Sequence, residues 1–222
     1  MSILIRPFKD SDTPFLIQIF HDAVRMIVFA AIACTAIYAS ERGVVGGTRI
    51  AIIGNAGSGK STLGTMLQKK LDLPLYHLDH YRWKPDWEKR DDAEFVAVHN
   101  QLCDKEAWII EGVATRFFDY RASKADTIIF LDVPTWLCLY RVLKRTVMLF
   151  GTIGDSNPPG CPERMPTLRF LCSVWSFNKE HKPLIEDILE KYRPTKRIFV
   201  VHNQHDLEHM LESIAQIKKE LV

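Results

Sequence analysis

From Thr48 onward, short apolar runs alternate with segments in which apolar residues recur every three or four positions. Runs of the first kind predict buried strands, and segments of the second kind predict amphipathic helices. The predicted strands are 49–54, 75–79, 107–111, 127–132 and 197–202, and the predicted helices are 60–71, 92–103, 135–150, 168–176, 184–192 and 206–218. Because strands that alternate with helices form parallel sheets, the pattern predicts an α/β three-layer sandwich with a five-stranded parallel sheet and helices on both faces.

Residues 1–46 have a different pattern and are predicted to be a segment appended to a domain at 47–222. An apolar strand at 3–5 precedes a helix with an apolar face, and the run 26–39 is apolar except for Thr35. A membrane-spanning helix needs roughly 18 to 20 apolar residues, and this run is shorter, so no transmembrane span is predicted. Self-association or membrane contact through this segment stays open.

Composition narrows the function classes. The chain has 222 residues, of which 47% are hydrophobic, and its 29 Lys and Arg against 27 Asp and Glu give a formal net charge of +2. This balance excludes a disordered chain, and it provides no global field for a nucleic acid or an anionic membrane. Five scattered cysteines without a CxxC pair are typical of reduced thiols, which favours a cytoplasmic location.

The strongest motif lies between the first strand and the first helix of the domain. The segment GNAGSGKS at 54–61 matches the Walker A pattern GxxxxGK[ST] in full. Its glycines allow successive backbone N–H groups to point into one hollow, where the start of the following helix adds positive potential. Such a hollow binds the phosphates of ATP, with Lys60 on the β- and γ-phosphates and Ser61 on Mg²⁺. The residues predicted to contact the nucleotide are Gly54, Asn55, Ala56, Gly57, Ser58, Gly59, Lys60, Ser61 and Thr62.

Other features exclude some classes of nucleotide-binding protein. A Ras-like GTPase would carry N-K-x-D after a late strand and D-x-x-G earlier, and the sequence has neither. The chain is also too short for the additional elements of AAA-type or helicase motors. A small kinase is the class that remains.

Residues 49–217 resemble the adenylate-kinase-like P-loop kinases, and most closely the bacterial DNA topology modulation (FlaR-like) proteins. The resemblance rests on Arg49–Thr62, Leu73–Asp79, Trp83–Trp87, Trp108–Gly112, Asp126–Pro134, Trp136–Arg145 and Gly160–Glu163. That family usually has Asp-Gly after the third strand, where this sequence has Glu111-Gly112. Residues 1–25 resemble the first strand and helix of GNAT N-acetyltransferases, but the acetyl-CoA loop of that family has no match downstream, so we interpret them as a fragment.

The resemblance implies further site residues. Arg141 and Arg145, four apart on a predicted helix, correspond to arginines that bind phosphates at the base of a mobile lid, here about 149–165. Their alternative interpretation is a solvated basic face. Asp79, expected at the carboxyl end of the second strand, would orient or deprotonate a hydroxyl acceptor, or alternatively would cap a turn. Glu111 would complete the Mg²⁺ shell with Ser61.

Two histidines flank Asp79, but His77 and His80 have no additional metal ligands near them in sequence, so we expect satisfied or solvent-facing imidazoles. The hypothesis that accounts for most of these residues is a Mg²⁺- and ATP-dependent small kinase with a nucleoside, nucleotide or related small-molecule acceptor. The alternative is a nucleotide-dependent regulatory or binding protein, linked to DNA topology, that transfers no phosphoryl group.

Overall fold

The five apolar runs predicted as strands form one parallel sheet in the order β2-β5-β1-β6-β7, which confirms the predicted fold class. The computed structural model describes residues 48–154 and 156–220. The sheet consists of β1 (Thr48–Gly54), β2 (Leu75–His77), β5 (Ala107–Glu111), β6 (Thr127–Leu131) and β7 (Arg197–Val201). The principal helices are α2 (Lys60–Leu71), α4 (Asp92–Cys103), α5 (Phe118–Lys124), α6 (Thr135–Leu149), α7 (Leu168–Glu180), α8 (Lys182–Tyr192) and α9 (Gln204–Glu220).

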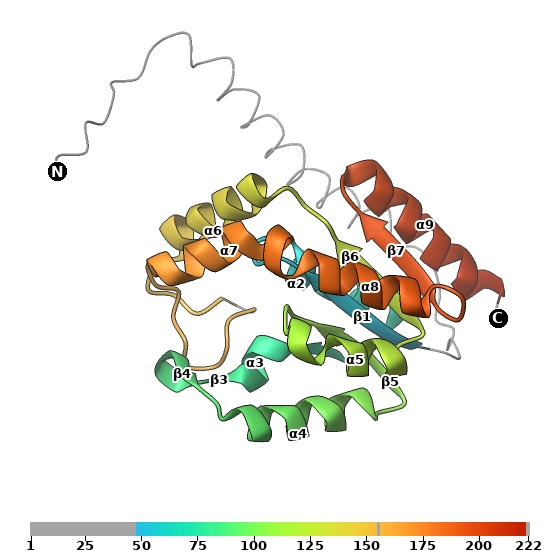
Figure 1. Cartoon of the computed structure of the whole chain (residues 1–222), viewed down its shortest axis with the longest axis horizontal. Coiled ribbons are helices and arrows are strands. Elements are labelled where there is room, and N and C mark those ends of the chain that lie inside the picture. Colours follow the sequence, from blue (N-terminus) through green and yellow to red (C-terminus); the bar gives the residue numbers. More distant parts are fainter. Residues whose placement is uncertain (1–47, 155, 221–222) are drawn as a thin grey trace, which may run out of the picture. The chain divides into compact units, whose positions relative to one another are not determined.

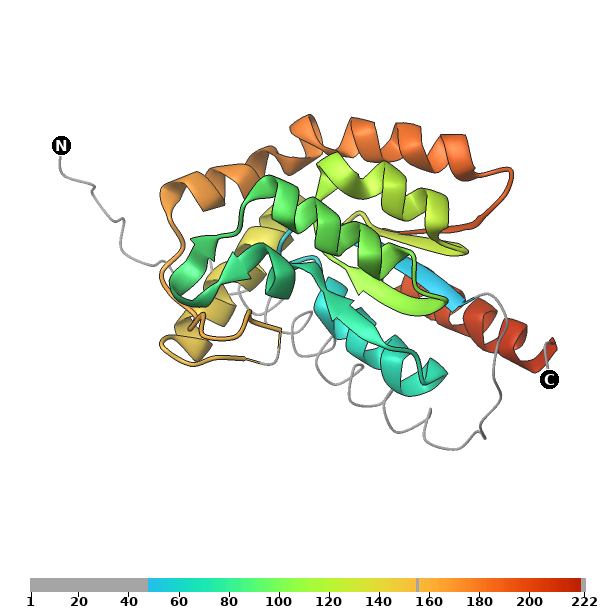
Figure 2. The same cartoon turned by 90° about the horizontal axis from the view of Figure 1, so that it is seen from below.

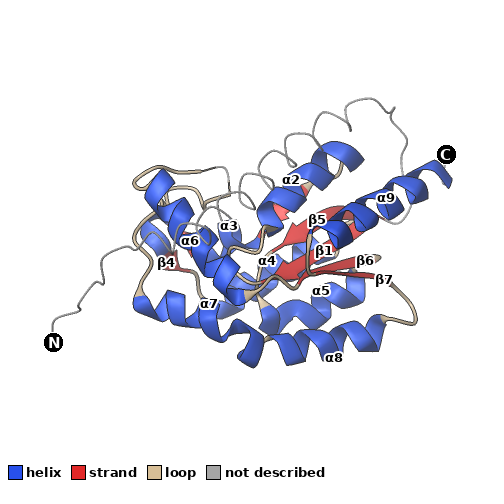
Figure 3. Ribbon diagram, turned by 90° about the horizontal axis from the view of Figure 1, so that it is seen from above, coloured by secondary structure: helices blue, strands red, loops and turns tan. Residues whose placement is uncertain are grey.

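Alternating side chains of the central strand β1 enter two different hydrophobic cores. Ala51 and Ile53 belong to one core with α4, α5 and α8, whereas Ile50 and Ile52 belong to another with α2 and α9. This separation follows from the two-residue repeat of a strand, which sends neighbouring side chains to opposite faces. The two helical layers lie on opposite sides of the sheet in Figure 3.

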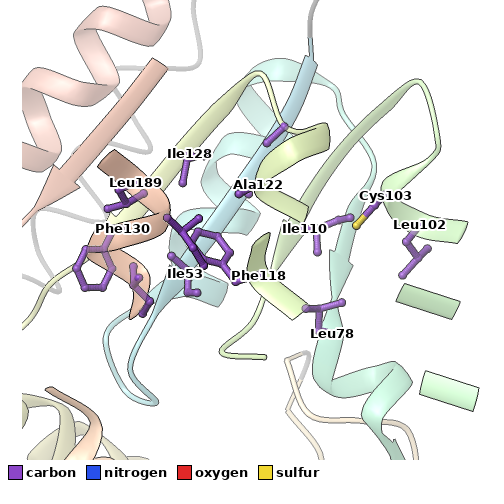
Figure 4. Close-up of a cluster of buried hydrophobic side chains, with 14 of the residues drawn as sticks. Ile53, Leu78, Leu102, Cys103, Ile110, Phe118, Ala122, Ile128, Phe130 and Leu189 are labelled. Carbon is purple, nitrogen blue, oxygen red and sulfur yellow. The ribbon is translucent and has the colours of Figure 1, made fainter. Parts of the chain in front are cut away.

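The larger core is filled by aromatic and branched aliphatic side chains that are almost entirely removed from solvent. Phe118 and Ala122 of α5 lie beside Ile53 and Phe130 of the sheet, and all four are at most 1% exposed (Figure 4). Burying a side chain of this size contributes about 1.5–3 kcal/mol to the free energy of unfolding. This core holds the strands in register, so the loops at their carboxyl ends lie together.

The second strand is shorter than predicted. β2 ends at His77, and α3 (Leu78–Arg82) follows at once, so Asp79 lies in the first turn of a helix and not at a strand end. The short hairpin strands β3 (Trp83–Lys84) and β4 (Glu88–Lys89) come next. The strand was predicted too long because of Leu78. This residue is 1% exposed and packs into the larger core, so it continues the apolar pattern of β2 although it is the first residue of a helix.

The predicted N-terminal segment, 1–46, lies outside the described residues. By its contacts the chain divides into two units, Met1–Arg42 and Gly43–Val222. The predicted boundary at 46/47 stays a prediction. The described residues contain no helix with both the length and the apolar character needed to cross a membrane.

Candidate functional site

The Walker A segment forms a tight loop between β1 and α2. The backbone N–H of Ser58 donates to the carbonyl of Asn55 at 3.1 Å, which closes the turn. Gly57 and Gly59 have φ angles of 78° and 102°, in the left-handed region where a side chain is strained. The predicted strand, glycine loop and helix are therefore all present, and the loop's N–H groups lie at the start of α2, as a phosphate-binding hollow requires.

Lys60 is the first residue of α2 and is 8% exposed. Its ammonium group donates to the carbonyl of Asn55 at 2.7 Å, so the side chain folds back across the loop. Burial lowers the pKa of Lys60, although the charges of Glu111 and Asp79 oppose that shift. A desolvated ammonium group on the loop is a donor for any anionic oxygen that enters the hollow.

Helices α6 and α7 both form hydrogen bonds with the Walker A loop. The side-chain amide of Asn55 donates to the carbonyl of Val174 in α7 at 2.8 Å. Arg141 of α6 donates through Nη1 to the carbonyls of Gly57 at 3.4 Å and Ser58 at 3.3 Å. Burial lowers the pKa of Arg141. The structure thus brings Arg141 to the loop, as the sequence predicts; its binding to phosphate stays a prediction.

Ser61, Glu111 and His77 form a connected polar cluster beside the loop. The Ser61 hydroxyl donates to Glu111 Oε1 at 2.9 Å, and Nδ1 of His77 lies 2.6 Å from the same oxygen. Burial acts to raise the pKa of Glu111, but the His77 hydrogen bond and the charge of Lys60 outweigh it, so this pKa is lowered. The carboxylate is therefore ionised at neutral pH.

The donor set of this cluster suits Mg²⁺, which prefers carboxylate and hydroxyl oxygens and retains several waters. Ser61 and Glu111, the predicted metal residues, are brought together as the sequence implies. Within residues 48–154 and 156–220, no group of three or more His, Cys, Asp and Glu side chains has the arrangement of a metal site. A Mg²⁺ ion here would depend on nucleotide phosphates and water for its remaining ligands.

The charge of Glu111 in this cluster also acts on the pKa of Asp79. Its side chain is exposed to solvent, yet enough protein surrounds it that desolvation raises the pKa, with a further contribution from Glu111. The charges of Lys60 and Arg145 act in the opposite direction. The charges of Lys60 and Arg145 therefore both act on Asp79, which lies in α3.

Arg145 contacts a carboxylate that the sequence did not single out as a site residue. Its Nε donates to Glu163 Oε1 at 3.2 Å, and Glu163 is 5% exposed. The same carboxylate accepts from the Thr146 hydroxyl at 3.2 Å and from the Asn157 amide at 3.3 Å. Glu163 thus links α6 to the predicted lid, and the one available signal was its position in the Gly160–Glu163 motif.

The described residues of the predicted lid, 149–154 and 156–165, contain no strand, and their one helical residue, Leu149, ends α6. They run beside the β3–β4 hairpin (Figures 1 and 2). The Trp87 indole donates to the carbonyl of Pro162 at 2.8 Å, and the backbone N–H of Asp86 donates to that of Gly160 at 3.1 Å. The Trp87 indole N–H is therefore engaged by the lid, which the sequence did not predict.

No protein-family model matches the chain. The uncharacterized protein YqaC of Bacillus subtilis strain 168 is 30% identical over 104 residues, which are 46% of this chain and 58% of that protein. The chain therefore matches less than two thirds of the length of this relative.

Solved structures with a related fold include a shikimate kinase from Acinetobacter baumannii in complex with shikimate, with 18% identity, 76% of this chain and 90% of that chain covered, and a TM-score of 0.47. A gluconokinase from Sinorhizobium meliloti 1021 has 16% identity, coverage of 80% and 95%, and a TM-score of 0.45. The resemblances to FlaR-like proteins and to GNAT acetyltransferases stay predictions. Both of these solved structures are kinases, at 18% and 16% identity to this chain.

Proposed function

We propose that this protein is a Mg²⁺- and ATP-dependent phosphotransferase that moves the γ-phosphoryl group of ATP to a hydroxyl or phosphate group of a small acceptor such as a nucleoside or nucleotide. The observation that carries the proposal is that the phosphate-binding loop and Asp79 lie at one edge of the sheet: Ser61 donates to Glu111 at 2.9 Å, Glu111 lies opposite His77 in the β2–β5 pairing, and Asp79 follows His77 two residues later in α3. A carboxylate at this edge can accept the proton of a hydroxyl acceptor, which binding of phosphate alone does not require.

Each residue of the loop has a role that its chemistry supports. The backbone N–H groups of 54–62 bind the β-phosphate, and Lys60 binds an oxygen between the β- and γ-phosphates. Arg141 donates to the loop carbonyls of Gly57 and Ser58, and the positive charge of Arg145 acts on Asp79. In the proposed reaction both guanidinium groups stand beside the transferred group. Positive charge around that group stabilises the transition state, in which negative charge spreads over its oxygens.

Asp79 acts on the acceptor. For a hydroxyl acceptor, the proton passes to the Asp79 carboxylate while the oxygen forms a bond to the γ-phosphorus, the bond from that phosphorus to the bridging oxygen breaks, and ADP leaves with that oxygen. Its raised pKa makes it a better proton acceptor than a free aspartate. Mg²⁺, when bound through Ser61 and Glu111, would neutralise charge on the phosphates.

Phosphoryl transfer can be tested with γ-labelled ATP, Mg²⁺ and pools of nucleosides, nucleotides and other small hydroxyl compounds. We expect a labelled product with the wild type, none with Lys60→Ala, and nucleotide binding without product with Asp79→Asn. Asp187→Asn, which changes an exposed carboxylate on α8, is the matched control and should retain transfer. ATP binding without a labelled product from any pool would contradict the proposal and favour the alternative, a nucleotide-dependent switch.

A further inference from the structure

The contact between His77 and Glu111 joins the last residues of two neighbouring strands. In the parallel pairing of β2 with β5, His77 lies directly opposite Glu111, and Nδ1 is 2.6 Å from Oε1. The two side chains are 14% and 7% exposed, so the hydrogen bond is largely shielded from water. A short hydrogen bond in such a site restricts the carboxylate to one orientation.

His77 is the donor in this hydrogen bond. Glu111 Oε1 already accepts from the Ser61 hydroxyl, and a carboxylate oxygen that accepts one hydrogen bond takes a second one in the same role, so the His77 Nδ1–H donates. Ser61 donates to the same oxygen at 2.9 Å, which leaves Glu111 Oε2 with no hydrogen bond from either of these residues. The imidazole ring is itself held against His80, with ring centroids 4.9 Å apart.

We infer that His77 is a positioning residue that orients Glu111 for Mg²⁺ bound together with the nucleotide. The inference rests on the nucleotide-binding part of the proposed function and not on transfer. Partners behind a metal-binding carboxylate fix its orientation, and their loss typically lowers metal affinity about 10- to 100-fold. His77 therefore acts on the metal through Glu111.

The test compares ATP binding with Mg²⁺ and with EDTA by calorimetry on the full chain. His77→Leu removes the donor, so we expect its Kd for ATP with Mg²⁺ to rise at least about tenfold while the Kd in EDTA changes less than about twofold. His77→Asn keeps an N–H donor near the position of Nδ1 and should restore most of the Mg²⁺-dependent affinity. His205→Asn, an exposed histidine of α9 at 89% side-chain exposure, is the matched control.

A second measurement covers the case in which His77→Leu does not fold. In a Glu111→Gln background, the inference predicts that His77→Ala, which should lower the Mg²⁺-dependent affinity when made alone, has no further effect on the Mg²⁺-dependent Kd, because the carboxylate that His77 positions is gone. Equal loss of affinity with Mg²⁺ and with EDTA, or no loss in either, would overturn the inference, as would ATP binding by the wild type that does not depend on Mg²⁺. A wild type that binds ATP with Mg²⁺ but transfers nothing would contradict only the proposed function.

Discussion

Gly57 packs directly against Cys138: a Cβ atom at Gly57 would lie 2.4 Å from the carbonyl oxygen of Cys138 in α6. Real Cβ atoms do not approach a backbone oxygen so closely, so any side chain at this position must displace either the loop or the helix. Arg141, one turn further along α6, donates to the carbonyl of Gly57 itself. The phosphate-binding loop and α6 are therefore fitted to each other.

Gly57→Ala should weaken nucleotide binding severely, because it combines a positive φ of 78° with this clash. We expect a loss of about 1–3 kcal/mol in the free energy of unfolding and a Kd for ATP raised at least about tenfold. Gly59→Ala is the comparison, since its φ is also positive but no atom lies within 4 Å of the added methyl group. Equal effects of the two variants in urea unfolding and calorimetry would contradict this explanation.

Lys60→Met should abolish nucleotide binding without lowering the stability of the ligand-free fold. Burial lowers the pKa of Lys60, so the charged form is disfavoured in the folded state, and an apolar side chain of similar length removes that cost. We expect Tm to stay unchanged or to rise without ligand, while the stabilisation of the wild type by ATP and Mg²⁺ disappears. Thermal melts with and without nucleotide measure both, and Lys69→Met, on the exposed side of α2, should keep the ligand response. A lower ligand-free Tm for Lys60→Met would show that the ammonium group stabilises the fold.

The rate of transfer should depend on the ionisation of Asp79. Desolvation, with Glu111, raises the pKa of this carboxyl above its ordinary value of 3.8, so the base becomes protonated at a higher pH than a free aspartate. The rate should therefore fall as pH decreases through the raised pKa. A kcat profile against pH that follows an unshifted aspartate would count against Asp79 as the base.

The raised pKa of Asp79 also predicts an effect on the free energy of unfolding. Because the folded state disfavours ionised Asp79, Asp79→Asn should raise the free energy of unfolding at pH 7. The difference should vanish as pH falls below the ordinary value of 3.8, where Asp79 is protonated in both the folded and the unfolded chain. Urea unfolding of wild type and variant at several pH values measures this, and a constant difference across pH would refute the assignment.

Glu163→Gln should loosen the predicted lid. The buried carboxylate accepts hydrogen bonds from Arg145, Thr146 and Asn157, and an amide replaces one accepting oxygen with a donor. We expect a loss of about 1–3 kcal/mol in the free energy of unfolding and faster proteolysis within 150–167. Glu190→Gln changes an exposed ion pair with Arg193 and should cost at most about 1 kcal/mol. The prediction fails if the two variants have equal stability.

Much of the fold could be predicted from the sequence because the same hydrophobic patterns recur along the chain. Each sheet strand is a short apolar run, and the Walker A pattern fixes a strand, a loop and a helix together. Helix α5 was missed, since its buried residues Phe118, Arg121 and Ala122 span barely one turn and show no sustained period. Such a helix is stabilised by the core it packs into, which local pattern does not reveal.

The site was only partly predictable for a similar reason. Ser61 and Glu111 were expected together because the resemblance to P-loop kinases implies a shared Mg²⁺ shell, and they form a hydrogen bond. His77 was expected to be an ordinary imidazole, whereas its partner is set by the β2–β5 register, which depends on strand order. Asp79 was expected at a strand end because the buried Leu78 extended the apolar run past the true end of β2.

Two hydrogen bonds, from the Trp87 indole to Pro162 and from the Asp86 N–H to Gly160, join the segment that follows α3 to the segment that precedes α7. Neither segment can move away from the other unless both hydrogen bonds break. If the protein transfers phosphoryl groups as proposed, entry of the acceptor and exit of the nucleotide product would share a single opening step, and the lifetime of this pair of contacts would help set the turnover rate.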